Sequence, residues 1–207
     1  SLGCDKNLAD SEEMLGLLTG NGHEIVDSEE EADAIVINTC CFIHDAKEES
    51  VNTILEMAEY KKTGTCKILI VTGCMAQRYK EEITEEIPEV DAVLGTTSYG
   101  DIVKALNEAE AGHVFQEFKD INALPEDSGR RVITTGGHFG YLKIAEGCDK
   151  HCTYCIIPSL RGKFRSVPEE RLLKQAEYMA SQGVRELILV AQETTVYGTD
   201  LYGKKTL

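Results

Sequence analysis

The sequence predicts an α/β fold: a doubly wound parallel sheet, followed by a second unit of the same βαβ kind. Two runs of apolar, mostly β-branched residues, 34–39 (AIVINT) and 67–73 (KILIVTG), are typical of strands buried on both faces. A segment between them carries apolar residues at helical spacing. Strands that alternate with helices in this way indicate a parallel sheet.

Two helices are expected in the first third of the chain. The first is expected to be capped by Asp10 or Ser11 and to end at 20–22 (GNG). The second, between the two strands, is expected to be capped by Asp45 and to end near Gly64. Helix, strand, helix and strand then follow one another as a βαβ fold requires.

The N-terminal domain is expected to end shortly after one more strand and helix. Residues 91–94 form a short apolar run, and a helical pattern follows from about 98 to 111. The sequence is then polar and rich in glycine over residues 116–137, and this composition is typical of a linker. We therefore assign residues 1–115 to the first domain.

The remaining residues, 138–207, are expected to form a second βαβ unit. A strand is predicted at 139–145, a helix from near Pro168, and a strand at 186–191. This is one step of a larger parallel structure.

The composition is that of an ordinary soluble protein, with 42% hydrophobic and 28% charged residues. No stretch approaches the ~18 apolar residues of a membrane span, and no signal peptide is recognisable, so we expect a cytoplasmic protein. In a reducing compartment, eight cysteines indicate metal binding or catalysis rather than disulfides. The formal net charge of −15 disfavours direct RNA binding and favours a basic partner.

Three cysteines share one short loop after a predicted strand, with the spacing CxxxCxxC: Cys148, Cys152 and Cys155. Three thiolates can hold three irons of a 4Fe–4S cube and leave the fourth iron open for a ligand. The alternative is a zinc site that uses His151, but a structural zinc needs a fourth ligand and paired CxxC knuckles. The spacing therefore favours an open iron–sulfur cluster.

Three other cysteines fit the carboxyl ends of strands. Cys40 and Cys74 follow the two apolar runs, and Cys4 fits the same place if a strand precedes it. Loops at these ends of a doubly wound sheet meet in one crevice, so the three thiols are expected to converge and hold a second cluster. The alternative is that they are small core residues.

The last two cysteines are expected to lie outside both clusters. Cys66 stands at the start of its strand, at the opposite edge of the sheet, and is expected to be a buried thiol. Cys41 is expected to point away from its neighbour, although it stays open as a ligand in place of Cys40.

The cysteine motifs resemble those of the radical S-adenosylmethionine (SAM) methylthiotransferases, which insert sulfur and a methyl group at an unactivated C–H bond. The order LGC, NTC, TGCMAQ and then CxxxCxxC carries the resemblance, which spans the whole chain. The segments SLGCDKNLADSE, CFIHDAKEES and AQETTVYGTDLYGK resemble the branch that modifies an aspartate of small-subunit ribosomal protein twelve. The residues 6–8 (KNL) differ from those typical of the tRNA-modifying branch.

The resemblance implies two 4Fe–4S clusters and two uses of SAM. The loop cysteines would hold the cluster that cleaves SAM to a radical, and Cys4, Cys40 and Cys74 would hold an auxiliary cluster that delivers sulfur. The second unit would be the start of a radical SAM partial (β/α) barrel. The family implies further barrel and a C-terminal domain, so this fragment alone is expected to be inactive.

Four residues are expected to contact SAM: Tyr154, Arg165, Gln192 and Glu193. Tyr154 is the aromatic residue before the last cysteine of the loop motif. Arg165 lies in the loop that follows, together with Arg161 and Lys163. These cations are expected to contact SAM or the substrate; the alternative is that they are solvated surface charges. Gln192 and Glu193 end a strand at the position where barrel-like folds gather their active sites.

The predicted function is methylthiolation of the β-carbon of an aspartate in small-subunit ribosomal protein twelve. A reductant protein such as flavodoxin or ferredoxin is the expected electron donor, and no membrane contact is expected. One alternative is a methylthiotransferase that acts on adenosine in tRNA. A more distant alternative is a zinc-stabilised binding module.

Overall fold

The computed structural model describes residues 1–126 and 128–207, and its first 117 residues build a parallel sheet of four strands. The strands lie in the order in which they occur in the chain: β1 (Ala34–Thr39), β2 (Ile68–Gly73), β3 (Ala92–Leu94) and β4 (Phe115–Glu117). β1 and β2 pair from Ala34 with Ile68 to Thr39 with Gly73, so these two strands end side by side.

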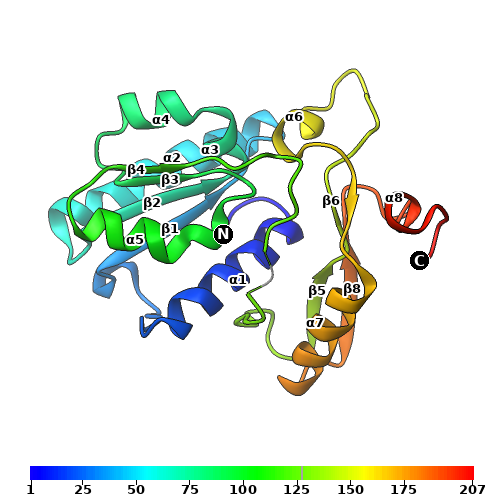
Figure 1. Ribbon diagram of the computed structural model, residues 1–207. Coiled ribbons are helices and arrows are strands. Elements are labelled where there is room, and N and C mark those ends of the chain that lie inside the picture. The colour runs from blue at the N-terminus through cyan, green and yellow to red at the C-terminus, as the bar shows by residue number, and fades with distance from the viewer. Residues whose placement is uncertain (127) are drawn as a thin grey trace.

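Helices cover both faces of this sheet (Figure 1). They are α1 (Asp5–Gly20), α2 (His44–Thr63), α3 (Cys74–Arg78), α4 (Lys80–Glu86) and α5 (Ile102–Glu110), with short 3₁₀ turns η1 (Glu29–Glu31) and η2 (Tyr99–Asp101). Ile68 and Ile70 of β2 pack toward α1 and α5, whereas Leu69 and Val71 pack toward α2, α3 and α4. The predicted doubly wound α/β domain is confirmed.

The two predicted helix caps are wrong. α1 begins at Asp5, with Cys4 as its N-cap, rather than at Asp10 or Ser11. The amide of Leu8 already donates to the carbonyl of Cys4 at 3.1 Å, and the first turns bury polar side chains, so the apolar period that marks a helix starts late. α2 begins at His44 after Ile43, and Asp45 lies in its first turn, where a carboxylate favours the helix dipole.

The second unit contains the predicted βαβ step. β5 (Phe139–Lys143) and β8 (Glu186–Val190) pair in parallel and are joined through α7 (Glu169–Ser181). Three further elements lie between β5 and α7, and one follows β8: β6 (Ala145–Glu146), α6 (Ile157–Arg161), β7 (Arg165–Ser166) and α8 (Thr199–Tyr202). β6 and β7 pair antiparallel, and the cysteine loop extends between β6 and α6.

The two units meet through α1 and α6 (Figure 1). Leu160 of α6 is buried in the core of the first unit, and the Thr96 hydroxyl donates to its carbonyl at 2.8 Å. On α1, Glu12 accepts hydrogen bonds from Arg131 and from the amide of Thr134, so part of the predicted linker lies fixed against this helix. Asp127, which also falls in the predicted linker, lies outside the described residues.

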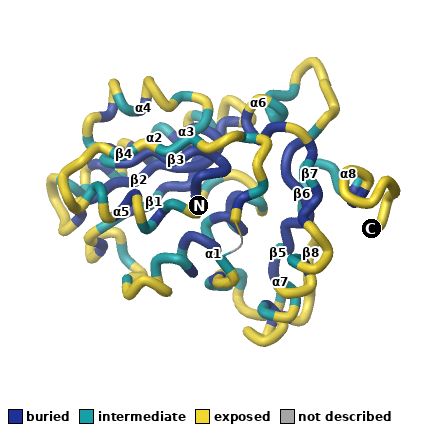
Figure 2. Tube along the Cα trace, viewed as in Figure 1, coloured by how far each residue is buried: buried dark blue, intermediate teal, exposed yellow. Residues whose placement is uncertain are grey.

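Burial is distributed unevenly between the two units (Figure 2). β2 is buried along its whole length, whereas Leu187, Ile188 and Leu189 of β8 remain exposed. An apolar strand with exposed side chains leaves surface that further structure can cover. In the described part of the chain, no helix combines the length and the apolar character needed to cross a bilayer.

Candidate metal centres

Three cysteines lie at the carboxyl edge of the four-stranded sheet. Cys40 follows the last residue of β1, and Cys74 follows the last residue of β2. The amide of Leu2 donates to the carbonyl of Asn38 at 2.8 Å, which places the N-terminal segment beside the end of β1. Cys4 is thereby brought to the same edge as the other two.

The Cys40 thiol lies beside the N-terminal segment that carries Cys4. A Cβ atom added to Gly3 would come within 2.8 Å of the Cys40 sulfur, so the backbone just before Cys4 passes directly over Cys40. Burial raises the pKa of the Cys40 thiol, and the negative charges of Cys74 and Cys4 raise that pKa further. These charge effects agree with a shared position of the three thiols at the carboxyl edge of the sheet.

Two asparagines fix the loops that carry these cysteines. The Asn7 side-chain amide donates to the carbonyls of Leu2 and Thr39, at 3.0 Å each. The Asn38 side-chain amide donates to the Asn7 carbonyl at 2.8 Å. The residues next to Cys4 and Cys40 are therefore tied to the start of α1.

The turn before Cys74 requires a glycine. Gly73 has a φ of +92°, and a Cβ atom at this position would lie 2.5 Å from the Thr39 carbonyl oxygen. A residue with a side chain would push apart the ends of β1 and β2, which carry Cys40 and Cys74. The glycine in the TGC motif thus has a direct steric cause.

The two remaining cysteines have the surroundings of core thiols. The Cys41 sulfur packs in the apolar core and donates to the Cys74 carbonyl at 3.3 Å, and burial raises its pKa to about 11. The Cys66 sulfur donates to the Ile68 carbonyl at 3.3 Å, at the opposite end of β2. Both sulfurs bond to backbone carbonyls inside the sheet domain, as structural thiols do.

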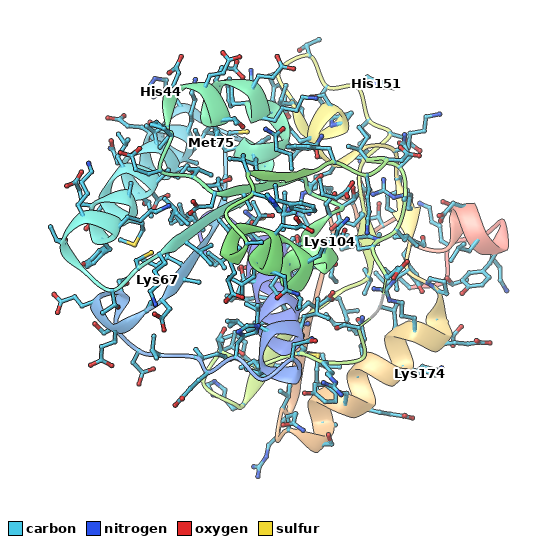
Figure 3. All side chains as sticks on the ribbon, turned by 60° about the vertical axis from the view of Figure 1, so that its left-hand side comes forward. His44, Lys67, Met75, Lys104, His151 and Lys174 are labelled. Carbon is cyan, nitrogen blue, oxygen red and sulfur yellow. The ribbon has the colours of Figure 1, made fainter. Side chains whose placement is uncertain are left out.

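The CxxxCxxC loop has a different setting from the strand-end set. Cys148 and Cys155 are partly buried, and Cys152 is exposed. The loop is closed at its base, where the Cys148 amide donates to the Gly162 carbonyl at 3.1 Å. His151 is exposed at the outside of this loop, on the side away from the four-stranded sheet (Figure 3).

Neither set gathers around a single point. All eight cysteines are free thiols. Among residues 1–126 and 128–207, no three His, Cys, Asp or Glu side chains are arranged to hold one metal ion. The three protein ligands of a 4Fe–4S cube bind three different irons, so they do not need to converge on one position. Three free thiols in each set supply the donor atoms that such a cube needs.

Two of the four predicted SAM contacts carry buried polar atoms without partners among the described residues. These atoms are both side-chain amide atoms of Gln192, and Nε and Nη2 of Arg165. Buried polar atoms in proteins are nearly always hydrogen-bonded, so unpaired ones at the carboxyl end of β8 and on β7 fit a polar ligand. The residues present are compatible with SAM at this position.

The other two predicted contacts differ from each other. Glu193 forms an ion pair with Lys150 of the cysteine loop and accepts hydrogen bonds from Thr195, and these bonds lower its pKa to about 2. Glu193 therefore holds the cysteine loop against the end of β8. Tyr154 is 84% exposed, and within residues 1–126 and 128–207 no interaction fixes its ring.

The sequence did not reveal a buried network of polar and charged side chains between the two units. The network consists of Asn7, Asp10, Lys143, Glu146 and Arg161. Arg161, expected in a loop that meets SAM, substrate or solvent, is instead only 2% exposed and bonded to three of the others. The strand segment YLKIAEG contained a signal for this network, because charged residues inside an apolar run need buried partners.

Family models match both units of the chain. Residues 1–95 match the model described as "Uncharacterized protein family UPF0004", and residues 142–205 match "Radical SAM superfamily". The first match contains the strand-end cysteines, and the second contains the CxxxCxxC loop. The two matches agree with the two structural units.

Relatives with a common name align with every residue of this chain. Proteins named ribosomal protein uS12 methylthiotransferase RimO are 66% identical in Lachnoclostridium phytofermentans, 52% in Clostridioides difficile and 51% in Acetivibrio thermocellus. Each alignment covers 100% of this chain and 47% of the relative, so the chain spans about half the length of the curated relatives it matches. The chain thus carries a UPF0004 match and a radical SAM match in order, and it is similar over its whole length to proteins named as uS12 methylthiotransferases.

Proposed function

We propose that this chain is the cluster-carrying part of a methylthiotransferase that inserts sulfur and a methyl group at the β-carbon of an aspartate in ribosomal protein uS12. The observation that carries the proposal is the presence of two separate sets of three free cysteines, one at the end of the parallel sheet and one in the loop after β6. A single-cluster SAM enzyme has no use for the first set.

The two sets have different proposed roles. Cys148, Cys152 and Cys155 would hold a 4Fe–4S cluster, which when bound supplies the electron that cleaves SAM and starts hydrogen abstraction. The other three cysteines would hold the auxiliary cluster close to the transferred sulfur. In this division, residues 1–115 form the auxiliary-cluster domain, 116–137 the linker and 138–207 the start of the radical SAM domain.

The chain's own residues would bind and orient SAM at the end of β8. Gln192 and Arg165 offer buried hydrogen-bonding atoms that await a partner, and Arg165 also has a positive charge suited to the SAM carboxylate. Glu193 would keep the cysteine loop close to this position through Lys150. Tyr154, on the exposed loop, would cover the bound SAM.

The proposed substrate is a basic protein rather than RNA. The chain has a formal net charge of −15, which repels phosphate groups and attracts a basic protein such as a ribosomal one. The relatives' name also specifies uS12. A tRNA substrate is the second candidate, because the family's chemistry is the same on either substrate.

Further parts of the proposal concern the conditions of activity. A cytoplasmic reductant protein such as flavodoxin or ferredoxin would supply electrons. Activity would need the remaining half that the relatives possess, since β8 leaves apolar side chains uncovered. Tests therefore use a protein of the relatives' full length, called the full-length protein below.

A competition experiment tests the substrate. The full-length protein, reconstituted with iron and sulfide under anaerobic conditions, is given SAM, a reductant and equal amounts of uS12 and unmodified tRNA. Mass spectrometry is expected to find the methylthio group on the uS12 aspartate. Modification of the tRNA alone would overturn the substrate while leaving the two-cluster chemistry in place, and modification of neither would overturn the function.

A further inference from the structure

Arg161 occupies a central position between the two cysteine sets. It is the last residue of α6, the helix that follows the CxxxCxxC loop, yet its side chain is buried against the carboxyl edge of the four-stranded sheet. The next residue, Gly162, accepts a hydrogen bond from the Cys148 amide at 3.1 Å. Arg161 is therefore connected through its own backbone to the base of the cysteine loop.

Its guanidinium group binds three partners in the buried network. Nη2 donates to Asn7 Oδ1 at 2.6 Å, and Nη1 donates to Asp10 Oδ2 at 2.9 Å and to Glu146 Oε1 at 3.2 Å. Lys143 bonds to the same two carboxylates, so two cations face two anions. A charge this deeply buried is tolerated only where its partners are fixed, which makes the guanidinium position a precise one.

The charges of Arg161 and of the strand-end thiols influence one another. Burial by itself lowers the pKa of the guanidinium, but the negative charges of Cys74, Glu146 and Asp10 raise that pKa well above its usual value. The positive charge of Arg161 in turn opposes the rise that burial causes in the pKa of Cys40. These effects agree with the place of the guanidinium at the sheet edge that carries the thiols.

A hydrogen-bonded connection from Arg161 to the strand-end cysteines runs through Asn7. Arg161 binds the oxygen of the Asn7 amide, which turns the amide nitrogen toward the carbonyls of Leu2 and Thr39. Those two carbonyls belong to the segments that carry Cys4 and Cys40. One guanidinium is therefore tied to the segments that carry Cys4 and Cys40, and through the neighbouring Gly162 to the base of the loop that holds the other set.

We propose that Arg161 is a positioning residue of the auxiliary cluster: through its hydrogen bonds to Asn7, Asp10 and Glu146 it fixes the strand-end cysteines relative to the CxxxCxxC loop, and it keeps a buried positive charge at the sheet edge that carries them. This inference rests on the proposed function, because it needs a cluster on Cys4, Cys40 and Cys74. Hydrogen bonds and positive charge at a cluster's sulfur atoms stabilise its reduced form and raise its reduction potential.

The test measures the auxiliary cluster by itself. In the full-length protein, Cys148, Cys152 and Cys155 are changed to alanine, so that only the strand-end set can bind a cluster. Arg161→Met and Arg161→Lys are then introduced separately, and iron per chain and the midpoint potential are measured by redox titration with electron paramagnetic resonance. Lysine keeps the charge but lacks the planar fork of donors.

Arg131→Met is the matched control. Arg131 is also a buried arginine that joins the second unit to α1, through Glu12 at 2.7 Å, but no interaction connects it to a cysteine among the described residues. Any general loosening of the contact between the units affects this variant as well. A change specific to Arg161 therefore reports on the cluster rather than on packing.

The expected result is a cluster potential shifted to a more negative value in Arg161→Met, a smaller shift in Arg161→Lys and none in Arg131→Met. If Arg161→Met does not fold, the midpoint potential of Arg161→Lys is compared with that of Arg131→Met instead. An unchanged potential in the variants that bind iron, or an equal shift in Arg131→Met, would overturn the role of Arg161 alone. Absence of iron from the parent protein with an intact Arg161 would overturn the auxiliary cluster itself.

Discussion

The two cysteine sets are built in opposite ways. Cys148, Cys152 and Cys155 lie within eight residues of one another on a partly exposed loop. Cys4, Cys40 and Cys74 come from three separate segments, and Cys40 and Cys74 are only 7% and 6% exposed. The first set is defined by local spacing, whereas the second exists only because β1 and β2 end side by side next to the N-terminal segment.

This difference indicates how each set depends on the rest of the protein. A loop set tolerates changes in the core because its spacing is covalent. A strand-end set is sensitive to every contact that fixes the sheet edge, including Asn7, Asn38 and the glycine before Cys74.

Removal of either set is expected to abolish methylthio transfer, but at different steps. Alanine at Cys148, Cys152 and Cys155 is expected to abolish SAM cleavage and to leave the fold unchanged, because this loop is largely outside the core. Alanine at Cys4, Cys40 and Cys74 is expected to leave SAM cleavage and to prevent sulfur insertion. Each triple variant should contain about four irons fewer per chain.

Deoxyadenosine release, iron content and product mass distinguish these outcomes in the full-length protein. Cys66→Ala serves as the control, since this thiol lies at the far end of β2. Loss of SAM cleavage in the strand-end variant with normal folding would contradict the division of roles.

Gly73→Ala is expected to lower the free energy of unfolding by about 3 kcal/mol or more, because a strained φ is combined with a clash against the backbone of Thr39. Gly22→Ala is the matched control: Gly22 has the same φ of +92° but no atom within 4 Å of the added Cβ. It is expected to cost only about 1 to 2 kcal/mol from the backbone conformation. Urea denaturation of the two variants measures the difference, and equal losses would show that crowding at the sheet edge has no effect.

Glu13→Gln is expected to have the smallest effect, and one that depends on pH. Burial raises the pKa of Glu13 above its usual 4.5, although Lys143 lowers it in part, and the Tyr99 hydroxyl donates to its carboxylate at 3.1 Å. The folded protein therefore binds this proton more tightly than the unfolded chain, so the carboxylate destabilises the fold as the pH rises above about 4.5.

Glutamine mimics the protonated acid, so the variant is expected to match the parent protein at pH 4 and to be more stable than it at pH 7. Denaturation curves at both pH values measure this. Tyr99→Phe removes a hydrogen bond that lowers the pKa of Glu13, so the loss of stability is expected to begin at the same pH as in the parent and to continue to a higher pH. A Glu13→Gln variant less stable than the parent at pH 7 would show that the charged carboxylate is needed at this position.

Much of the fold followed from local patterns. The strands predicted at 34–39 and 186–191 are found at Ala34–Thr39 and Glu186–Val190, and the end of α2 beside Gly64 follows from the residue that stops the helix. The start of α1 did not follow, because Asn7 and Asp10 face inward and break the apolar period that marks a buried helix face. Helix prediction by apolar spacing fails where the buried partners are themselves polar.

The sequence by itself determined the βαβ order, the CxxxCxxC loop and the position of Cys40 and Cys74 at strand ends, because each depends on residues close together in the chain. Only the tertiary structure showed that Arg161 leaves its loop and enters a buried network with Asp10 and Glu146. Those residues are 151 and 15 positions away along the chain. Buried charges select partners by position in space, and no local pattern specifies which distant charges will meet.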